Sequence, residues 1–142
     1  MKSSWQHFLS CYRNYFKFSG RASRSEYWFF IMWYLVFMFA PLLVVASIAP
    51  SSESLLVGIC GLMLIYALIS IIPLLAVTVR RFRDRNYSAW WVLGWIVASA
   101  VCSAFAEMGG IFTLLSLAVT IAYVVFVSQP GTKGDNRFGP QP

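Results

Sequence analysis

The chain alternates between long apolar runs and short polar segments. Four runs contain no Asp, Glu, Lys, Arg or His, and they cover about residues 27–49, 54–79, 89–106 and 111–128. A helix that rises about 1.5 Å per residue needs roughly 20 apolar residues to cross about 30 Å of hydrocarbon. The pattern therefore predicts an all-α integral membrane protein with four transmembrane helices, folded as a single membrane domain over residues 1–142.

The segment before the first run has a helical period of its own. Over residues 4–17, apolar and aromatic side chains recur at spacings of three and four. They are Trp5, Phe8, Leu9, Tyr12 and Phe16. This predicts an N-terminal amphipathic helix at the membrane interface; a helix packed on the protein's own spans is the alternative. At the other end, residues 129–142 are rich in Gly, Pro and polar residues, which predicts an irregular tail.

Three local features refine the runs. Ser23 and Glu26 have the spacing of a capping box and predict the start of the first span. Pro73 lies inside the second run, where a neighbour must satisfy the carbonyl that it leaves unpaired. In the third run, small residues at every fourth position predict an internal packing seam or, alternatively, a homodimer face. These small residues are Gly94, Ala98, Cys102 and Ala106.

Charge distinguishes the two ends of the predicted spans. Of the eleven Lys and Arg residues, five precede the first run, four lie between the second and third runs, and two lie in the tail. The segments without bases contain Glu53 and Glu107 instead. By the positive-inside rule, both termini are predicted to be cytoplasmic. The net charge of +6 indicates anionic lipid and not nucleic acid, because bases that flank apolar runs meet lipid headgroups.

The sequence argues against several kinds of chemistry. Uncharged runs argue against a proton-coupled transporter. His7 is the only histidine and the three cysteines have no zinc-like spacing. No nucleophile elbow or phosphate-cradling glycine loop is present. No catalytic residue, metal or cofactor is therefore predicted, and the protein is not expected to be an enzyme.

The remaining candidate site is the predicted cytoplasmic face, where three basic segments contain acids or amides as well. Arginine binds phosphate through a planar fork, so arginines that converge there can hold a lipid headgroup or another anion. The alternative is that the bases only set orientation and pair with neighbouring acids, at about 0–1 kcal/mol for each surface pair.

Three motifs in these segments carry a family resemblance. Residues 18–28 (FSGRASRSEYW) resemble F-x-G-R-x-x-R-x-E-[FY]-W, residues 80–91 (RRFRDRNYSAWW) resemble R-R-L-H-D-x-x-x-S-G-W-W, and residues 134–142 (GDNRFGPQP) resemble G-x-N-[RK]-[YF]-G-x-x-P. In these motifs the chain resembles the small bacterial inner-membrane proteins of the YhaH/YhaI type, the family of domain of unknown function 805. Arg83 stands where that family usually has His, and Ala89 where it has Gly.

The resemblance implies an inner-membrane location and supplies no activity. Because its motif residues fall on the predicted cytoplasmic face, we expect them to form one site for an anion, a lipid headgroup or a protein partner. In it, Glu26 and Asp84 would orient arginines, tryptophans would fix the depth in the membrane, and Gly139 and Pro140 would turn the tail back. The candidate residues are Arg21, Arg24, Glu26, Trp28, Arg80, Arg81, Asp84, Ser88, Trp90, Trp91, Asn136, Arg137, Gly139 and Pro140.

The expected function is that of a non-enzymatic envelope or membrane-stress accessory protein. It would engage anionic lipid headgroups, a membrane partner or a second copy of itself through the basic face. The alternative is a small oligomeric transporter or pore for an apolar or weakly polar solute. A membrane enzyme that acts on lipid at the arginine cluster is a third hypothesis.

Overall fold

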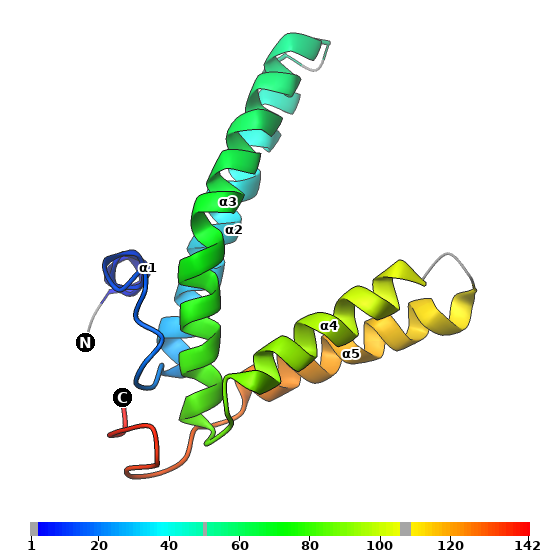
Figure 1. Ribbon diagram of the computed structural model, residues 1–142. Helices are drawn as coiled ribbons and strands as arrows, with labels where there is room; N and C mark the ends of the chain where they lie inside the picture. The colour runs from blue at the N-terminus through cyan, green and yellow to red at the C-terminus, as the bar shows by residue number, and fades with distance from the viewer. Residues whose placement is uncertain (1–2, 50, 106–108) are drawn as a thin grey trace. The chain divides into compact units, whose positions relative to one another are not determined.

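The computed structural model describes residues 3–49, 51–105 and 109–142, which contain helices and no strand. Figure 1 shows the helices in chain order. They are α1 (Ser4–Arg13), α2 (Arg24–Ile48), α3 (Glu53–Asp84), α4 (Trp90–Ala104) and α5 (Gly110–Ser128). The predicted all-helical fold is confirmed for this part of the chain. Ala106 and Glu107, which figure in the predictions, lie outside the described residues.

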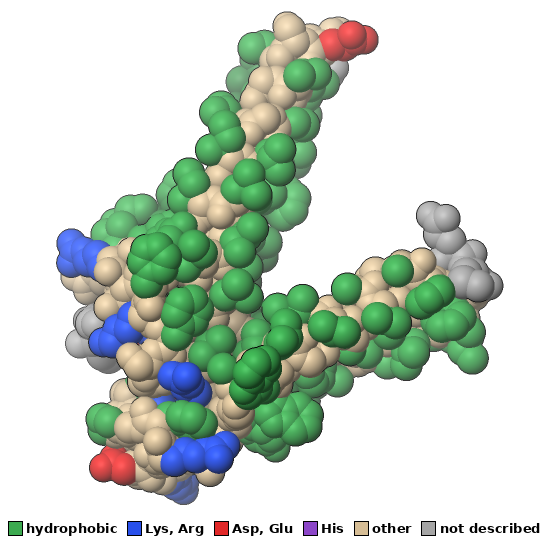
Figure 2. All heavy atoms as spheres, in the orientation of Figure 1, with side chains coloured by type: hydrophobic (Ala, Val, Ile, Leu, Met, Phe, Trp, Pro, Cys, Tyr) green, Lys and Arg blue, Asp and Glu red, His purple; other side chains and the backbone are tan. Residues whose placement is uncertain are grey.

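Three of these helices are long and apolar enough to cross a membrane: α2, α3 and α5. They match the first, second and fourth predicted runs. The third run corresponds to α4, which has 15 residues and is therefore about 22 Å long, less than the hydrocarbon thickness. Figure 2 shows many hydrophobic side chains on the visible face of these helices. Apolar side chains on the outside are expected when lipid is the solvent.

Helix α3 continues past its predicted end. The apolar run stops at residue 79, but the helix includes the basic residues that follow and ends at Asp84. Asn86 adopts a left-handed conformation with φ 65°. The N–H of Tyr87 donates to the carbonyl of Phe82, and that of Asn86 to the carbonyl of Arg83. This is a Schellman motif in which Asn takes the place of the usual Gly.

The chain divides into two compact units, which are described separately. The first comprises residues 1–17 and 25–77. Within it, the aromatic face of α1 packs on α2: Phe8 stacks on Phe30 with ring centroids 5.7 Å apart, and Trp5 meets Trp33 edge-on at 5.3 Å. The structure thus shows the packing on the protein's own helices that the sequence left open. Helix α1 also ends earlier than predicted, at Arg13.

Pro73 lies inside α3, and the helix continues through it. Because proline has no N–H, the carbonyl of Ile69 loses its partner one turn away. The hydroxyl of Tyr15 donates a hydrogen bond of 2.5 Å to this carbonyl. Next to it, the hydroxyl of Tyr12 lies 2.7 Å from that of Ser70. The segment that follows α1 therefore supplies the neighbour that a proline in a membrane helix requires.

The second unit comprises residues 18–24 and 78–142. In it, α4 and α5 pack together as a hairpin. Phe82, at the end of α3, is 1% exposed and lies 4.6 Å from Phe126 of α5 between ring centroids. Of the small residues predicted to form a seam, Cys102 is buried. Gly94 and Ala98 instead line an open apolar groove with residues of α5.

Candidate functional site

Asp84, the last residue of α3, is the centre of a buried ionic cluster in the second unit. Its Oδ1 atom accepts a hydrogen bond of 2.9 Å from Nε of Arg21 and lies 2.9 Å from Nη2 of the same side chain. Its Oδ2 atom lies 2.5 Å from Nη1 of Arg81, one turn earlier in α3. Each carboxylate oxygen therefore has a guanidinium of its own. We call Arg21, Arg81 and Asp84 the clamp.

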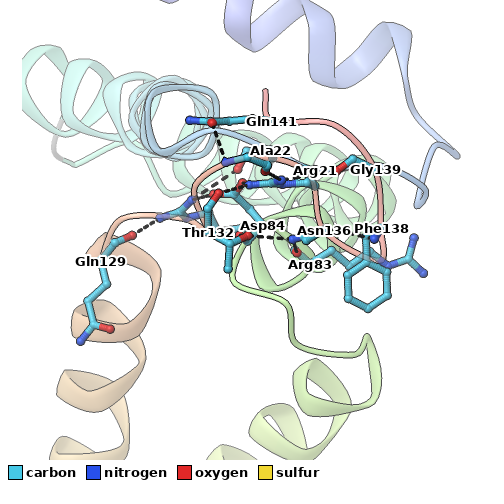
Figure 3. A network of polar contacts seen from close by, with 12 residues as sticks. Arg21, Ala22, Arg83, Asp84, Gln129, Thr132, Asn136, Phe138, Gly139 and Gln141 are labelled. Carbon is cyan, nitrogen blue, oxygen red and sulfur yellow. Dashed lines mark hydrogen bonds and ion pairs between the residues drawn. The ribbon is translucent and has the colours of Figure 1, made fainter.

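The clamp arginines hold the tail through its backbone. Arg21 donates from Nη1 to the carbonyls of Gly134 (2.6 Å) and Gly139 (3.4 Å), and from Nη2 to that of Thr132 (2.6 Å). Figure 3 shows Arg21 near Thr132 and Gly139 of the tail. A guanidinium has five N–H donors in a fixed fork, and those of Arg21 are committed to carbonyls and to Asp84.

Arg81 is committed in the same way. It donates from Nε to the carbonyl of Val127 (2.9 Å), from Nη1 to that of Ala22 (3.4 Å) and from Nη2 to that of Gln129. Both side chains are at least 99% buried. The clamp arginines therefore join the segment around Ala22, the end of α3 and the tail, and their donors are already used within the protein.

The tail also caps α3. The N–H and the hydroxyl of Thr132 both donate to the carbonyl of Asp84, each at 2.9 Å. Nδ2 of Asn136 donates to the carbonyl of Arg83 and to the Thr132 hydroxyl, again at 2.9 Å. The last carbonyls of a helix have no partner within it. Here Thr132 and Asn136 supply those partners from the far end of the chain (Figure 3).

Gly131 is a site residue that sequence reasoning missed. A Cβ atom at this position would lie 2.5 Å from Cγ and 2.7 Å from Oδ1 of Asp84, and closer still to Oδ2. Only a residue without a side chain lets the tail approach the carboxylate this closely. The Pro130-Gly131 pair marks a loop in the sequence, but nothing local indicates that Asp84 is the neighbour.

The end of the tail is less irregular than predicted. Asn136 and Gly139 exchange two backbone hydrogen bonds of 3.2 and 3.0 Å across a tight turn. The Asn136 side chain also accepts from the N–H of Phe138 (2.9 Å), and Gly139 has φ 130°. The carbonyl of Gly139 reaches the clamp, as noted for Arg21, whereas Pro140 is exposed.

Three further arginines lie against aromatic rings. The guanidinium of Arg85 is 4.0 Å from the ring centroid of Phe126. Those of Arg83 and Arg137 lie 5.3 and 4.7 Å from the ring centroid of Phe138. A guanidinium over a ring face is attracted by the ring quadrupole. Arg85 therefore packs on the C-terminal end of α5, and Arg83 and Arg137 pack on the turn of the tail, in addition to carrying charge.

The other predicted residues have different surroundings. Glu26 lies in the first unit, where its carboxylate accepts a hydrogen bond of 3.8 Å from the thiol of Cys11. Arg80 is buried and Arg24 is exposed. The hydroxyl of Ser88 accepts from the N–H of Trp90 at 3.4 Å. Of the tryptophans, Trp28 lies on α2, and Trp90 and Trp91 begin α4; all three are exposed.

A pocket of about 320 Å³ lies beside the clamp. Its walls include the clamp, Arg24 and Lys133. Arg81 lies in the last turn of α3, beyond its apolar stretch, and burial lowers the pKa of its guanidinium. The Asp84 carboxylate raises this pKa, and the charge of Arg24 lowers it further. An arginine starts from so high a pKa that it stays protonated. The pocket is therefore a place where positive charges are held close together.

Comparisons with known proteins agree with the motifs. The model of the family described as "Protein of unknown function (DUF805)" matches residues 15–140. Inner membrane protein YhaH of Escherichia coli is 33% identical over 95% of this chain and 94% of its own length. Inner membrane protein YhaI of the same organism is 32% identical over 96% and 95%.

Uncharacterized protein YiiR of Escherichia coli is 30% identical over 87% of this chain and 84% of its own length. No solved structure matches the chain. The family match covers the first two motif segments, residues 134–140 of the third, and all of the sequence between them. The chain therefore belongs to the DUF805 family of membrane proteins.

Proposed function

We propose that the protein is a non-enzymatic accessory protein of the bacterial inner membrane that engages anionic lipid headgroups through a cytoplasmic basic face. In this proposal α2, α3, α4 and α5 all cross the bilayer, and both termini are cytoplasmic. The three long apolar helices and the names of the relatives support the membrane location. The sorting of bases into alternate segments supports the orientation.

The observation that carries the proposal is a division of roles among the bases of the second unit. Arg21 and Arg81 use their N–H donors on Asp84 and on main-chain carbonyls, so they hold the tail in place. Arg24 and Lys133 are exposed beside them. Within the described residues neither side chain has an acidic partner. Cations left unpaired next to long apolar helices suit anionic headgroups, at about 1 kcal/mol for each base near the surface.

The test is the lipid that accompanies the full chain from native membranes. The protein is purified in mild detergent, and bound lipid is identified by mass spectrometry against the total membrane extract. We expect enrichment of anionic lipid that falls as salt is raised, because exposed charges are screened. The same lipid ratio in the protein and in the extract, at every salt concentration, would contradict the proposal.

A further inference from the structure

We propose that the pocket formed by the clamp, Arg24 and Lys133 binds a single phosphate group and prefers a phosphomonoester to a phosphodiester. The inference deepens the proposed function and rests on it for the lipid source of the phosphate. Inorganic phosphate carries the same chemistry from another source. Three properties of the pocket support the inference: its charge, the geometry of its donors and its size.

The charge of the pocket is unbalanced. Four cations line it: Arg21, Arg24, Arg81 and Lys133. Asp84 is the only acidic side chain among the described residues that line it. The Asp84 carboxylate is already bracketed by the clamp arginines. The clamp therefore keeps a net charge of +1, and Arg24 and Lys133 add two more positive charges. A phosphomonoester carries close to two negative charges at neutral pH, and a phosphodiester carries one.

The donors that remain suit a tetrahedral anion. Arg24 offers a planar fork and Lys133 a mobile ammonium, which are the two side-chain types that bind phosphate. Their positions depend on the clamp, because Arg24 follows Ala22 by two residues and Lys133 follows Thr132 directly. The main chain of Ala22 accepts from Arg81, and that of Thr132 from Arg21. The clamp thus sets the separation of the two free cations, and its own donors are spent on these main-chain carbonyls and on Asp84.

The size and lining of the pocket limit what else can bind. A volume of about 320 Å³ holds a phosphate and a small headgroup. The described residues that line it include no aromatic ring, so a nucleobase has nothing to stack on. A suitable ligand places its phosphate in the pocket and keeps its acyl chains outside. A lipid with a terminal phosphate, such as phosphatidic acid, meets this requirement.

The experiment compares the unaltered full chain with two variants by native mass spectrometry in detergent. The pocket variant is Arg24→Gln with Lys133→Gln. The matched control is Arg13→Gln with Lys17→Gln, which removes two exposed bases of the first unit. Each protein is titrated with phosphatidic acid, phosphatidylglycerol and phosphatidylcholine, and separately with inorganic phosphate. Neither Arg24 nor Lys133 belongs to the clamp, so we expect the pocket variant to fold. Melting temperatures check that both variants do so.

We expect phosphatidic acid to bind the unaltered chain at least fivefold more tightly than phosphatidylglycerol. The pocket variant should lose at least tenfold in affinity for phosphatidic acid, and the control less than twofold. Equal affinity for the two anionic lipids would overturn the phosphomonoester preference and leave the proposed function standing. Binding of inorganic phosphate with no preference for anionic lipid would keep the pocket and overturn the proposed function. Equal losses in the pocket variant and the control would overturn the pocket.

Discussion

The Cα atom of Gly131 packs against the carboxylate of Asp84 with no room for a side chain between them. The contact joins the tail to the end of α3, 47 residues earlier in the chain. It explains why the Asp84 carboxylate is 95% buried although it lies at a helix end. The tail covers one side of the Asp84 carboxylate, and the Arg21 and Arg81 side chains cover the other.

Gly131→Ala tests this contact. A methyl group would have to push the tail away from Asp84 and lengthen the bonds from Arg21 and Arg81. Such overpacking costs about 1–3 kcal/mol, and we expect a lower melting temperature in detergent. Gly94→Ala is the matched control, because a Cβ at that position meets nothing within 4 Å. If both variants melt like the unaltered protein, the tail does not pack on Asp84 in solution.

Asp84→Asn removes the charge that both buried guanidiniums share. Loss of one partner of a buried ion pair leaves an uncompensated charge, at a cost of about 3–5 kcal/mol. We therefore expect a large loss of stability, measured by thermal or denaturant unfolding in detergent. Asp135→Asn, an exposed acid of the same tail, should change stability by less than about 0.5 kcal/mol. Similar effects for the two variants would show that the clamp does not stabilise the fold.

Arg21→Lys keeps the charge but removes the fork. A lysine ammonium cannot reach Asp84 and three tail carbonyls at once. The tail should then open more often while α4 and α5 stay folded. Hydrogen exchange followed by mass spectrometry should show at least tenfold faster exchange over residues 132–139 and unchanged exchange in α5. Arg13→Lys changes an exposed arginine of the first unit and provides the comparison. Unchanged exchange over residues 132–139 in Arg21→Lys, or an equal acceleration in Arg13→Lys, would contradict the role of Arg21.

Tyr15→Phe leaves the carbonyl of Ile69 without a partner. An intramolecular hydrogen bond of this kind contributes about 0.5–1.5 kcal/mol. The cause can be isolated with Pro73→Ala, which restores the N–H that this carbonyl lacks. We expect Tyr15→Phe to destabilise the unaltered chain more than it destabilises the Pro73→Ala variant, which is a coupling measurable by a double-mutant cycle. Simple additivity of the two substitutions would show that the hydroxyl does not serve the proline site.

The tail contacts also have a consequence for topology. Arg21, the end of α3 and the tail meet in one unit, so they must lie on the same side of the membrane. Reporter fusions after residue 86 and after residue 142 should both report the cytoplasm, and a fusion within residues 51–53 should report the opposite side. Fusions at 86 and 142 that report opposite sides would contradict both the orientation and the clamp.

The amino-acid sequence was enough to predict the positions of the apolar helices, the uncharged runs that form most of each helix and the segments that carry the bases. Preference for lipid or water is a property of each residue in turn, so it can be read along the chain without knowledge of contacts. The motifs were likewise enough to predict the family. The ends of the helices were predicted less well, since α3 continues through its basic residues and α1 stops at Arg13.

The folded structure was needed to show which arginines bind the protein itself and which remain exposed. The sequence gives Arg21, Arg24 and Arg81 the same chemistry, but the partners of Arg21 and Arg81 include carbonyls up to 118 residues away. The thiol of Cys11 likewise donates to the carboxylate of Glu26, 15 residues away in the sequence, and no motif indicates that contact. Long side chains choose partners by the distances that the folded backbone creates, and no local pattern records those distances.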